Sequence, residues 1–326
     1  MQKTTLSKKI RSVLRWAGWV LLVQLILINI SAALYADKLT RYYNINSNSP
    51  VEGSGNIFSK SWKLFTGPKY PRPRVTSVPV FPYDTVSFTT RKGIRIDAWY
   101  AAADSAPKGT VIFFHGIQTT RTSLLDEVNE FRYMGMNVLM IDFRGHGNSG
   151  GHTTTIGMRE SEEVKLAFDY VRNKGERNIF LYGMSMGAVS VTKALFDYGL
   201  DPAGVILDAP FLSLQSYLRG RARVIGFPDQ PFAFITCFWI GVEKGFNGFR
   251  HKTTRYAGDI RCPVLVQWGS LDNYVLEEEI RAVYDAIPSP DKKLVEYNGA
   301  DHESFLRYDT EKWRRETEAF LRSYTR

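Results

Sequence analysis

From Asp84 onward, short apolar runs alternate along the chain with amphipathic stretches. Continuous apolar runs are typical of strands buried on both faces, and apolar residues at every third or fourth position are typical of helices. The pattern predicts strands at 84–90, 94–101, 110–116, 137–145, 178–183, 204–210, 263–269 and 293–299. It predicts helices at 124–134, 158–174, 186–198, 275–287 and 310–324. This alternation predicts an α/β domain with a mostly parallel sheet flanked by helices.

A different pattern precedes this domain, an apolar run from Trp16 to Tyr35 that contains no charged residue. About 20 residues of helix cross the hydrocarbon core of a bilayer. The run follows five basic residues, Lys3, Lys8, Lys9, Arg11 and Arg15. The positive-inside rule therefore predicts a single-pass transmembrane helix with a cytoplasmic N-terminus and an extracytoplasmic catalytic domain. The alternative is a signal peptide cleaved near residues 31–33, which would give a secreted protein.

The chain divides into three predicted parts. Residues 1–43 hold the cytosolic flank and the membrane anchor, residues 44–83 a linker and a proline-rich arm, and residues 84–326 the α/β domain. The segment 44–56 is rich in Asn, Ser and Gly, which is typical of a tether. The segment 67–82 holds too many prolines for a helix or a central strand, so we expect it to lie on the surface of the domain.

One serine lies between two methionines and two glycines in Gly183-Met184-Ser185-Met186-Gly187. Ser185 falls at the junction of a predicted strand and a predicted helix, where a sharp turn strains the backbone and crowds its neighbours. Small residues two positions before and after the serine relieve that crowding. Such a turn exposes the hydroxyl above the sheet and directs the Met186 N–H toward a developing oxyanion. The alternative is a glycine-flanked turn without chemistry, but the strand before it and the helix after it favour a nucleophile.

A serine nucleophile needs a base, and this turn is typically followed by an acid and then a histidine. Among the five histidines, His302 follows the last predicted strand and is the expected base. Asp272 directly follows strand 263–269, where its carboxylate would fix the tautomer of His302. Alternatively, Asp272 only caps the next helix. Asp208, at the end of a neighbouring strand, is the second candidate acid. Asp301 adjoins His302, but sequence neighbours rarely direct their side chains at each other.

The second oxyanion donor is expected from the loop after strand 110–116. The Ile117 N–H is the candidate, because Gly116 allows the backbone to turn in closely. We expect His115 to brace this loop through hydrogen bonds. One such donor typically stabilises the transition state by ~3 kcal/mol.

Charge and cysteine content narrow the choice of partners and cofactors. The net charge of +9 divides between the N-terminal flank and residues 219–255, which disfavours nucleic-acid binding. The second basic group is either a solvated face or a surface that meets anionic lipid or an acidic substrate. Cys237 and Cys262 make no disulfide framework and are expected as small buried side chains, with a single bridge left open. No Cys/His spacing indicates a metal, and no cofactor is expected.

Taken in order, these motifs resemble the α/β-hydrolase superfamily over about residues 84–324. The segment "DFRGHGNSGG" (142–151) resembles the serine-aminopeptidase-like and Bem46-like branches. The resemblance implies a structural role for this loop, so no chemistry is expected of Arg144 or His146. It also implies that the insertion at about 211–258 is a lid, whose aromatic residues either wall an acyl pocket or only pack the lid onto the sheet. Asp301 stands where a glycine more commonly precedes the base.

The sequence therefore predicts a membrane-anchored serine hydrolase that cleaves carboxylic esters through Ser185, His302 and Asp272. Small-molecule or lipid esters are the expected substrates, with acyl lipids and thioesters among them. One alternative is an aminopeptidase-like serine peptidase, which would need acidic groups near the pocket, whereas the insertion is basic. The other is a non-catalytic scaffold on a hydrolase fold. The sequence leaves the natural substrate and the oligomeric state open.

Overall fold

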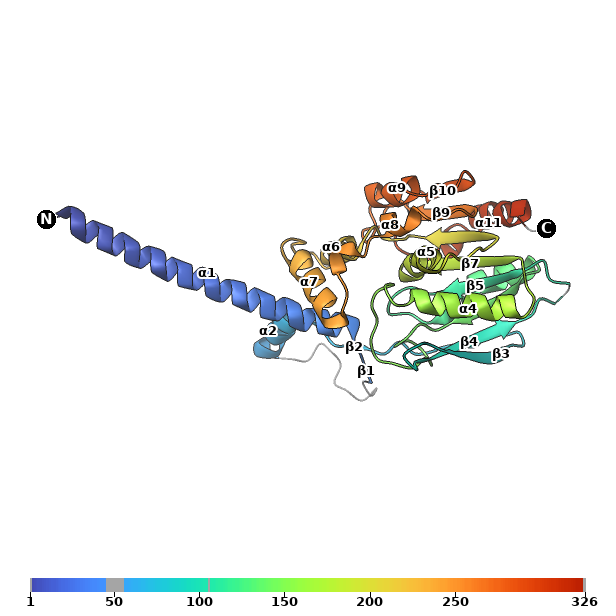
Figure 1. Cartoon of the computed structure of the whole chain (residues 1–326), viewed down its shortest axis with the longest axis horizontal. Helices are drawn as coiled ribbons and strands as arrows, with labels where there is room; N and C mark the ends of the chain where they lie inside the picture. The colour runs from blue at the N-terminus through green and yellow to red at the C-terminus, as the bar shows by residue number, and fades with distance from the viewer. Residues whose placement is uncertain (1, 45–55, 105, 325–326) are drawn as a thin grey trace.

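A single long helix, α1 (Gln2–Thr40), joins the N-terminus to the α/β domain (Figure 1). The computed structural model describes residues 2–44, 56–104 and 106–324. Large apolar side chains from Ile10 to Leu34 are exposed, whereas Ala36 and Leu39 are fully buried against the domain. Among the described residues, α1 is the one helix long and apolar enough to cross a membrane. The apolar run predicted from the sequence is thus part of a longer helix whose last turns belong to the core.

Short elements connect α1 to the domain. Strands β1 (Tyr42–Tyr43) and β2 (Tyr70–Pro71) form a parallel pair, and helix α2 (Ile57–Thr66) packs beside α1 (Figure 1). Lys38 of α1 donates to Thr66 Oγ1 at 2.5 Å, at the end of α2. The sequence did not predict α2, and most of the tether predicted at 44–56 lies outside the described residues.

The proline-rich arm that follows α2 lies along the domain, as its composition led us to expect. Arg72 extends from this arm and donates from Nε to Gly147 O at 3.1 Å and from Nη1 to Gly151 O at 3.0 Å. The arm is therefore fastened to the loop at 142–151.

Eight strands form the main sheet in the order β10-β9-β8-β7-β5-β6-β4-β3. The strands are β3 (Asp84–Thr89), β4 (Arg95–Ala101), β5 (Thr110–Phe114), β6 (Asn137–Ile141), β7 (Ile179–Met184), β8 (Gly204–Asp208), β9 (Val264–Gly269) and β10 (Lys292–Tyr297). Strand β4 runs antiparallel to β3 and β6, and all other neighbours are parallel. The predicted α/β fold with a mostly parallel sheet is confirmed.

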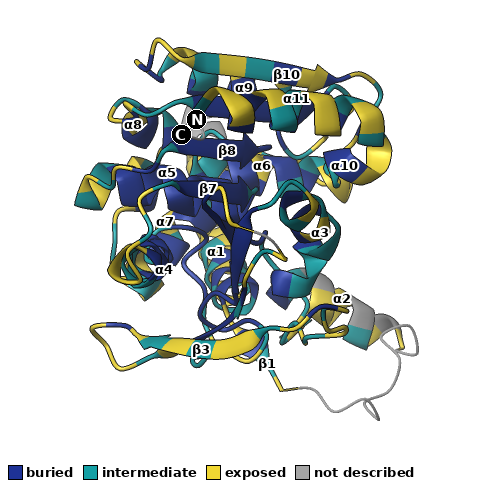
Figure 2. Ribbon diagram, turned by 90° about the vertical axis from the view of Figure 1, so that its right-hand side faces the viewer, coloured by how far each residue is buried: buried dark blue, intermediate teal, exposed yellow. Residues whose placement is uncertain are grey.

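Helices cover both faces of the sheet. They are η1 (Arg121–Leu124), α3 (Leu125–Tyr133), α4 (Ser161–Asn173), α5 (Met186–Tyr198), α9 (Glu277–Asp285), α10 (Phe305–Tyr308) and α11 (Thr310–Tyr324). Side chains alternate along β5, so that Ile112 packs with α4 and α5 while Phe113 packs with α3 and α11. The central strands are therefore buried on both faces (Figure 2), which explains why their sequences are continuous apolar runs.

The insertion between β8 and β9 forms four short helices. They are α6 (Leu214–Val224), α7 (Phe232–Lys244), η2 (Gly248–Arg250) and α8 (Thr253–Ala257). Helix α7 packs against α1. Trp239 Nε1 donates to Asn29 Oδ1 at 3.3 Å, and the rings of Phe232 and Tyr35 pack edge to face with centroids 5.1 Å apart. The insertion thus lies between the sheet and the long helix (Figure 1). Its role as a lid remains a prediction.

Candidate active site

Ser185 occupies a sharp turn between β7 and α5. Its backbone has φ 52° and ψ −112°, a conformation that residues other than glycine rarely adopt. A Cβ at Gly187 would lie 2.0 Å from Phe114 O, and one at Gly183 would lie 2.6 Å from Ala188 N. The two glycines are thus required by close backbone approaches, and the strained turn presents the serine at the carboxyl edge of the sheet.

His302 and Asp272 form a hydrogen-bonded pair, with Nδ1 of the histidine 2.7 Å from Oδ2 of the aspartate. The other carboxylate oxygen, Oδ1, accepts the N–H groups of Tyr274 at 2.7 Å and Val275 at 2.9 Å. The Asp272 side chain is fully buried. The residue that caps α9 is Leu276, so Asp272 braces the loop before the helix and does not cap it.

The other two candidate acids are engaged elsewhere. Asp208 accepts hydrogen bonds from the Tyr182 hydroxyl and, at 2.8 Å, from Gln267 Nε2. Burial raises the pKa of Asp208 to about 7, against the opposing effect of these hydrogen bonds. Asp301 Oδ1 accepts the backbone N–H of His302 at 2.8 Å. Of the three aspartates, only Asp272 has a hydrogen bond to the His302 ring within the described residues.

Hydrogen bonding in the loop after β5 distinguishes Gln118 from Ile117. The Gln118 N–H donates to His146 Nε2 at 3.3 Å, whereas the Ile117 N–H has no acceptor among the described residues. The carbonyl oxygen of Gly116 accepts from Thr119 Oγ1 at 2.9 Å and from His115 Nδ1 at 2.7 Å. On the other side, Met186 begins α5, where N–H groups lack intrahelical acceptors.

Two buried histidines hold this loop in place. His115 Nε2 accepts the Phe143 N–H at 3.0 Å, and His146 Nδ1 donates to Arg144 O at 2.8 Å. Burial lowers the pKa of His115 to about 4 and that of His146 to about 3, so both rings stay neutral. His115 thus braces the loop as the sequence predicted.

Tyr42 makes a contact with His146 that the sequence did not predict. Its hydroxyl donates to His146 Nε2 at 2.9 Å, and the same nitrogen accepts the Gln118 N–H. Tyr42 comes two residues after the end of α1 and is almost fully buried. The long helix is therefore connected, through one tyrosine and one histidine, to the loop beside Ser185.

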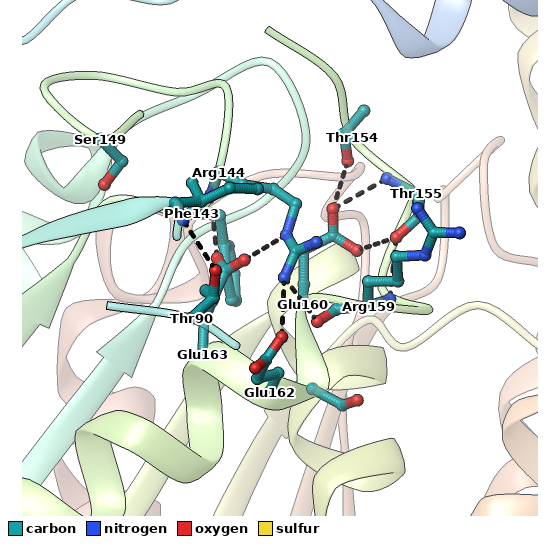
Figure 3. Close-up of polar contacts among 12 residues, drawn as sticks. Thr90, Phe143, Arg144, Ser149, Thr154, Thr155, Arg159, Glu160, Glu162 and Glu163 are labelled. Atoms are coloured by element: carbon teal, nitrogen blue, oxygen red, sulfur yellow. Dashed lines mark hydrogen bonds and ion pairs between the residues drawn. The ribbon is translucent and has the colours of Figure 1, made fainter. Parts of the chain in front are cut away.

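The loop at 142–151 is fastened to the start of α4 by a buried polar network (Figure 3). The Arg144 N–H donates to Glu163 Oε2 at 2.8 Å, and its guanidinium binds Glu163 and the carbonyl oxygen of Arg159. Glu160 accepts from Thr154 Oγ1 at 2.9 Å and Thr155 Oγ1 at 2.6 Å. None of these side chains lines the cavity beside Ser185, which agrees with a structural role for the loop.

A cavity of about 430 Å³ lies beside Ser185. Its walls include Ile117, Ser185, Phe211, Tyr217, Arg221 and His302, and we call it the Ser185 cavity. Two aromatic residues of the insertion thus wall the pocket. The aromatic residues of α7 lie elsewhere, with Phe234 and Phe238 about half exposed and Trp239 against α1.

Neither a metal cluster nor a disulfide occurs in the described part of the chain. No group of three or more His, Cys, Asp or Glu side chains there is arranged to hold a metal ion. Cys237 is buried and Cys262 partly buried, and both are free thiols. Burial raises the pKa of each to about 12, so neither is a reactive thiolate.

Comparisons with known proteins agree with the observed fold. The family model described as "Serine aminopeptidase, S33" matches residues 105–230. The Saccharomyces cerevisiae membrane protein YNL320W is 24% identical over 231 residues, which cover 70% of this chain and 76% of that protein. The Danio rerio lysophosphatidylserine lipase ABHD12 is 22% identical over 199 residues, which cover 57% of this chain and 49% of the lipase.

Solved structures with the same fold include an esterase. The Pyrococcus furiosus esterase Pf2001 superposes with a TM-score of 0.65 and 25% sequence identity, over 78% of this chain and 98% of the esterase. The strand order, the turn at Ser185 and these matches show that the chain belongs to the α/β-hydrolase superfamily.

Proposed function

We propose that this protein is a membrane-anchored serine hydrolase that cleaves carboxylic esters. The observation that carries the proposal is the 2.7 Å hydrogen bond between His302 and Asp272, since His302 lines the same cavity as Ser185. The names of the relatives, which include an esterase and a lysophosphatidylserine lipase, support ester substrates.

In the proposed reaction, Ser185 Oγ attacks the ester carbonyl while His302 Nε2 takes its proton. Asp272 holds the Nδ1–H tautomer of His302 and stabilises the imidazolium that forms. The N–H groups of Ile117 and Met186 donate to the oxyanion, with each donor typically contributing ~3 kcal/mol. His302 then protonates the departing alcohol, and a water molecule deprotonated by His302 hydrolyses the acyl-enzyme to release the acid.

The charges at the Ser185 cavity favour an ester over a peptide with a free amino terminus. An aminopeptidase needs a carboxylate in the pocket to hold the substrate ammonium group. Two arginines, Arg221 and Arg307, line this cavity together with a single acid, the exposed Glu303. Because the arginines outnumber the acid, the lining is net positive, which disfavours binding of a substrate ammonium group. The hydrogen-bonded His302–Asp272 pair argues against a non-catalytic scaffold.

We further propose that α1 spans the membrane and that two neighbouring helices lie in the membrane interface. Helix α2 exposes Phe58 and Trp62, and α7 exposes Phe234, Phe238 and Val242 at a spacing of four residues along one face. Both helices pack against α1 near the point where its side chains become buried. Exposed apolar faces beside a transmembrane helix are typical of interfacial segments, which would hold the Ser185 cavity close to lipid.

Turnover of p-nitrophenyl esters of increasing acyl length tests the proposed activity in the purified full chain. We expect Ser185→Ala to lower kcat by about 10⁴-fold or more. Ser123→Ala is the matched control, because Ser123 also lines the cavity but its Oγ donates to Thr120 O at 2.9 Å. Equal turnover by the wild type and Ser185→Ala would overturn the proposal.

A further inference from the structure

Arg221 carries a positive charge into the Ser185 cavity without a carboxylate to balance it. Its Nη1 donates to Tyr217 OH at 3.2 Å and its Nη2 to Tyr70 OH at 2.7 Å. Its Nε is buried and has no hydrogen-bond partner. Within the described residues, Arg221 forms no ion pair with a carboxylate.

Two arginines with buried side chains are neutralised by acids. Arg121 Nη2 lies 2.7 Å from Asp97 and 3.4 Å from Asp142. Arg144 is paired with Glu163. Arg221 is partly buried, and a charge that loses hydration without gaining an ion pair lowers stability. The contrast indicates that the balancing anion of Arg221 arrives with a ligand.

The two tyrosines hold the guanidinium in place without neutralising it. Tyr217 lies one turn before Arg221 on α6, and Tyr70 comes from β2, across the interface between the insertion and the arm. The guanidinium carbon also lies 5.9 Å from the ring centroid of Tyr217 and 5.3 Å from that of Tyr70. The second arginine of the cavity, Arg307, is paired with Asp126 at 2.6 Å, so Arg221 is the charge left for a substrate.

We propose that Arg221 is an anion-binding subsite that selects esters carrying a carboxylate or phosphate group near the scissile bond. This inference rests on the proposed hydrolase function and names its substrate class. A guanidinium presents paired N–H donors that match the geometry of carboxylate and phosphate oxygens. Apolar Phe211 and Val275 also line the cavity, and a low local dielectric strengthens such an interaction.

The test compares three matched esters on the full chain in detergent micelles. They are a neutral monoacylglycerol, the same acyl chain on glycerol 3-phosphate, and a glycerol half-ester of a dicarboxylic acid. The second ester carries its anion on the alcohol side of the scissile bond, and the third carries it on the acyl side. The one with the higher kcat/KM identifies which part of the substrate Arg221 contacts.

We expect the wild type to prefer one anionic ester over the neutral ester by about tenfold or more in kcat/KM. Arg221→Gln should bring the anionic and neutral esters to similar kcat/KM values, mainly by raising KM for the anionic ester. Arg221→Lys should retain part of the preference. Arg219→Gln is the matched control, because Arg219 lies on the same helix but is exposed and pairs with Asp229 at 2.8 Å. An equal loss on all three esters, or no preference in the wild type, would overturn the inference.

A binding measurement separates this inference from the proposed reaction. Octyl phosphate and octanoate should raise the Tm of Ser185→Ala protein more than octanol does, and Arg221→Gln should remove the difference. If that holds while no ester is cleaved, the subsite stands and the hydrolase proposal fails. If esters are cleaved without any preference for anions and the Tm shifts are equal, the hydrolase stands and the subsite fails.

Discussion

The carboxylate of Asp272 holds His302 with one oxygen and its own loop with the other, since Oδ2 lies 2.7 Å from His302 Nδ1 and Oδ1 accepts two backbone N–H groups. The loop that follows β9 therefore fixes the acid before any substrate arrives. Because both oxygens are engaged, the carboxylate has little freedom to turn toward another base. This relationship gives the proposed acid a direct test.

Asp272→Asn should lower kcat by about 10⁴-fold with a small change in KM, because an amide favours the wrong tautomer of His302. Asp301→Asn is the matched control, since Asp301 Oδ1 contacts only backbone N–H of its neighbour. We expect it to keep kcat within about threefold of the wild type. Steady-state kinetics on a p-nitrophenyl ester measures both. Near-normal kcat in folded Asp272→Asn would show that another residue is the acid.

Tyr42→Phe should weaken the link between α1 and the loop beside Ser185. The variant loses the hydrogen bond to His146 Nε2, which lowers the free energy of unfolding by about 1 kcal/mol. We also expect kcat to fall several-fold, since His146 holds the Gln118 N–H. Denaturant unfolding and ester kinetics are the measurements.

Tyr43→Phe controls for the loss of a tyrosine hydroxyl at this end of α1. Tyr43 is partly buried, and its hydroxyl donates weakly to Asp37 Oδ2 at 3.4 Å. It should leave kcat unchanged. If Tyr42→Phe and Tyr43→Phe behave alike in both assays, Tyr42 has no special connection to the site.

His251 predicts a pH dependence of folding. Burial lowers its pKa from 6.5 to about 4, while its Nε2–H donates to Ile156 O at 2.8 Å. Between pH 6.5 and 4 the unfolded chain binds a proton that the folded chain does not, so His251 stabilises the fold above pH 6.5 and loses that effect as the pH falls. His251→Gln removes this contribution.

Between pH 7 and pH 5, the wild type should therefore lose about 2 kcal/mol more stability than His251→Gln. Urea unfolding at the two pH values measures the difference, with each protein serving as its own reference. Identical losses would mean that His251 titrates alike in the folded and unfolded chains.

The membrane proposal predicts where lipid reaches the protein. A spin label can be attached to Phe238→Cys in a chain that also carries Cys237→Ser and Cys262→Ser. In lipid nanodiscs, this label should be accessible to oxygen and shielded from a water-soluble nickel complex. Position 133 is the matched control, because Tyr133 is 90% exposed on α3, outside the elements that contact α1. A label at 238 that is as accessible to nickel as one at 133 would place α7 in water.

Much of the α/β domain follows from the sequence, for a physical reason. Strands such as β5 and β7 are buried on both faces, so their apolar runs are continuous and end where the chain turns. The strand predicted at 137–145 ends earlier, at Ile141, where the chain enters the loop held by Arg144.

The contacts that lie outside this pattern were not predictable. Tyr42 and His146 are 104 positions apart, and no periodicity relates them. Arg219 and Arg221 look alike as members of one basic segment. Residues two positions apart lie on opposite sides of a helix, so one arginine faces solvent and the other faces the cavity. The sequence pattern does not reveal which is which, because that depends on what packs against α6.

The most direct test of the account is the reactivity of Ser185 toward a fluorophosphonate probe, followed by mass spectrometry of the labelled peptide. The proposal predicts that the folded full chain is labelled at Ser185, that Ser185→Ala is not labelled, and that His302→Ala reacts far more slowly. A folded wild type that does not react, or a Ser185→Ala variant that is labelled as fast as the wild type, would contradict the assignment of Ser185 as the nucleophile.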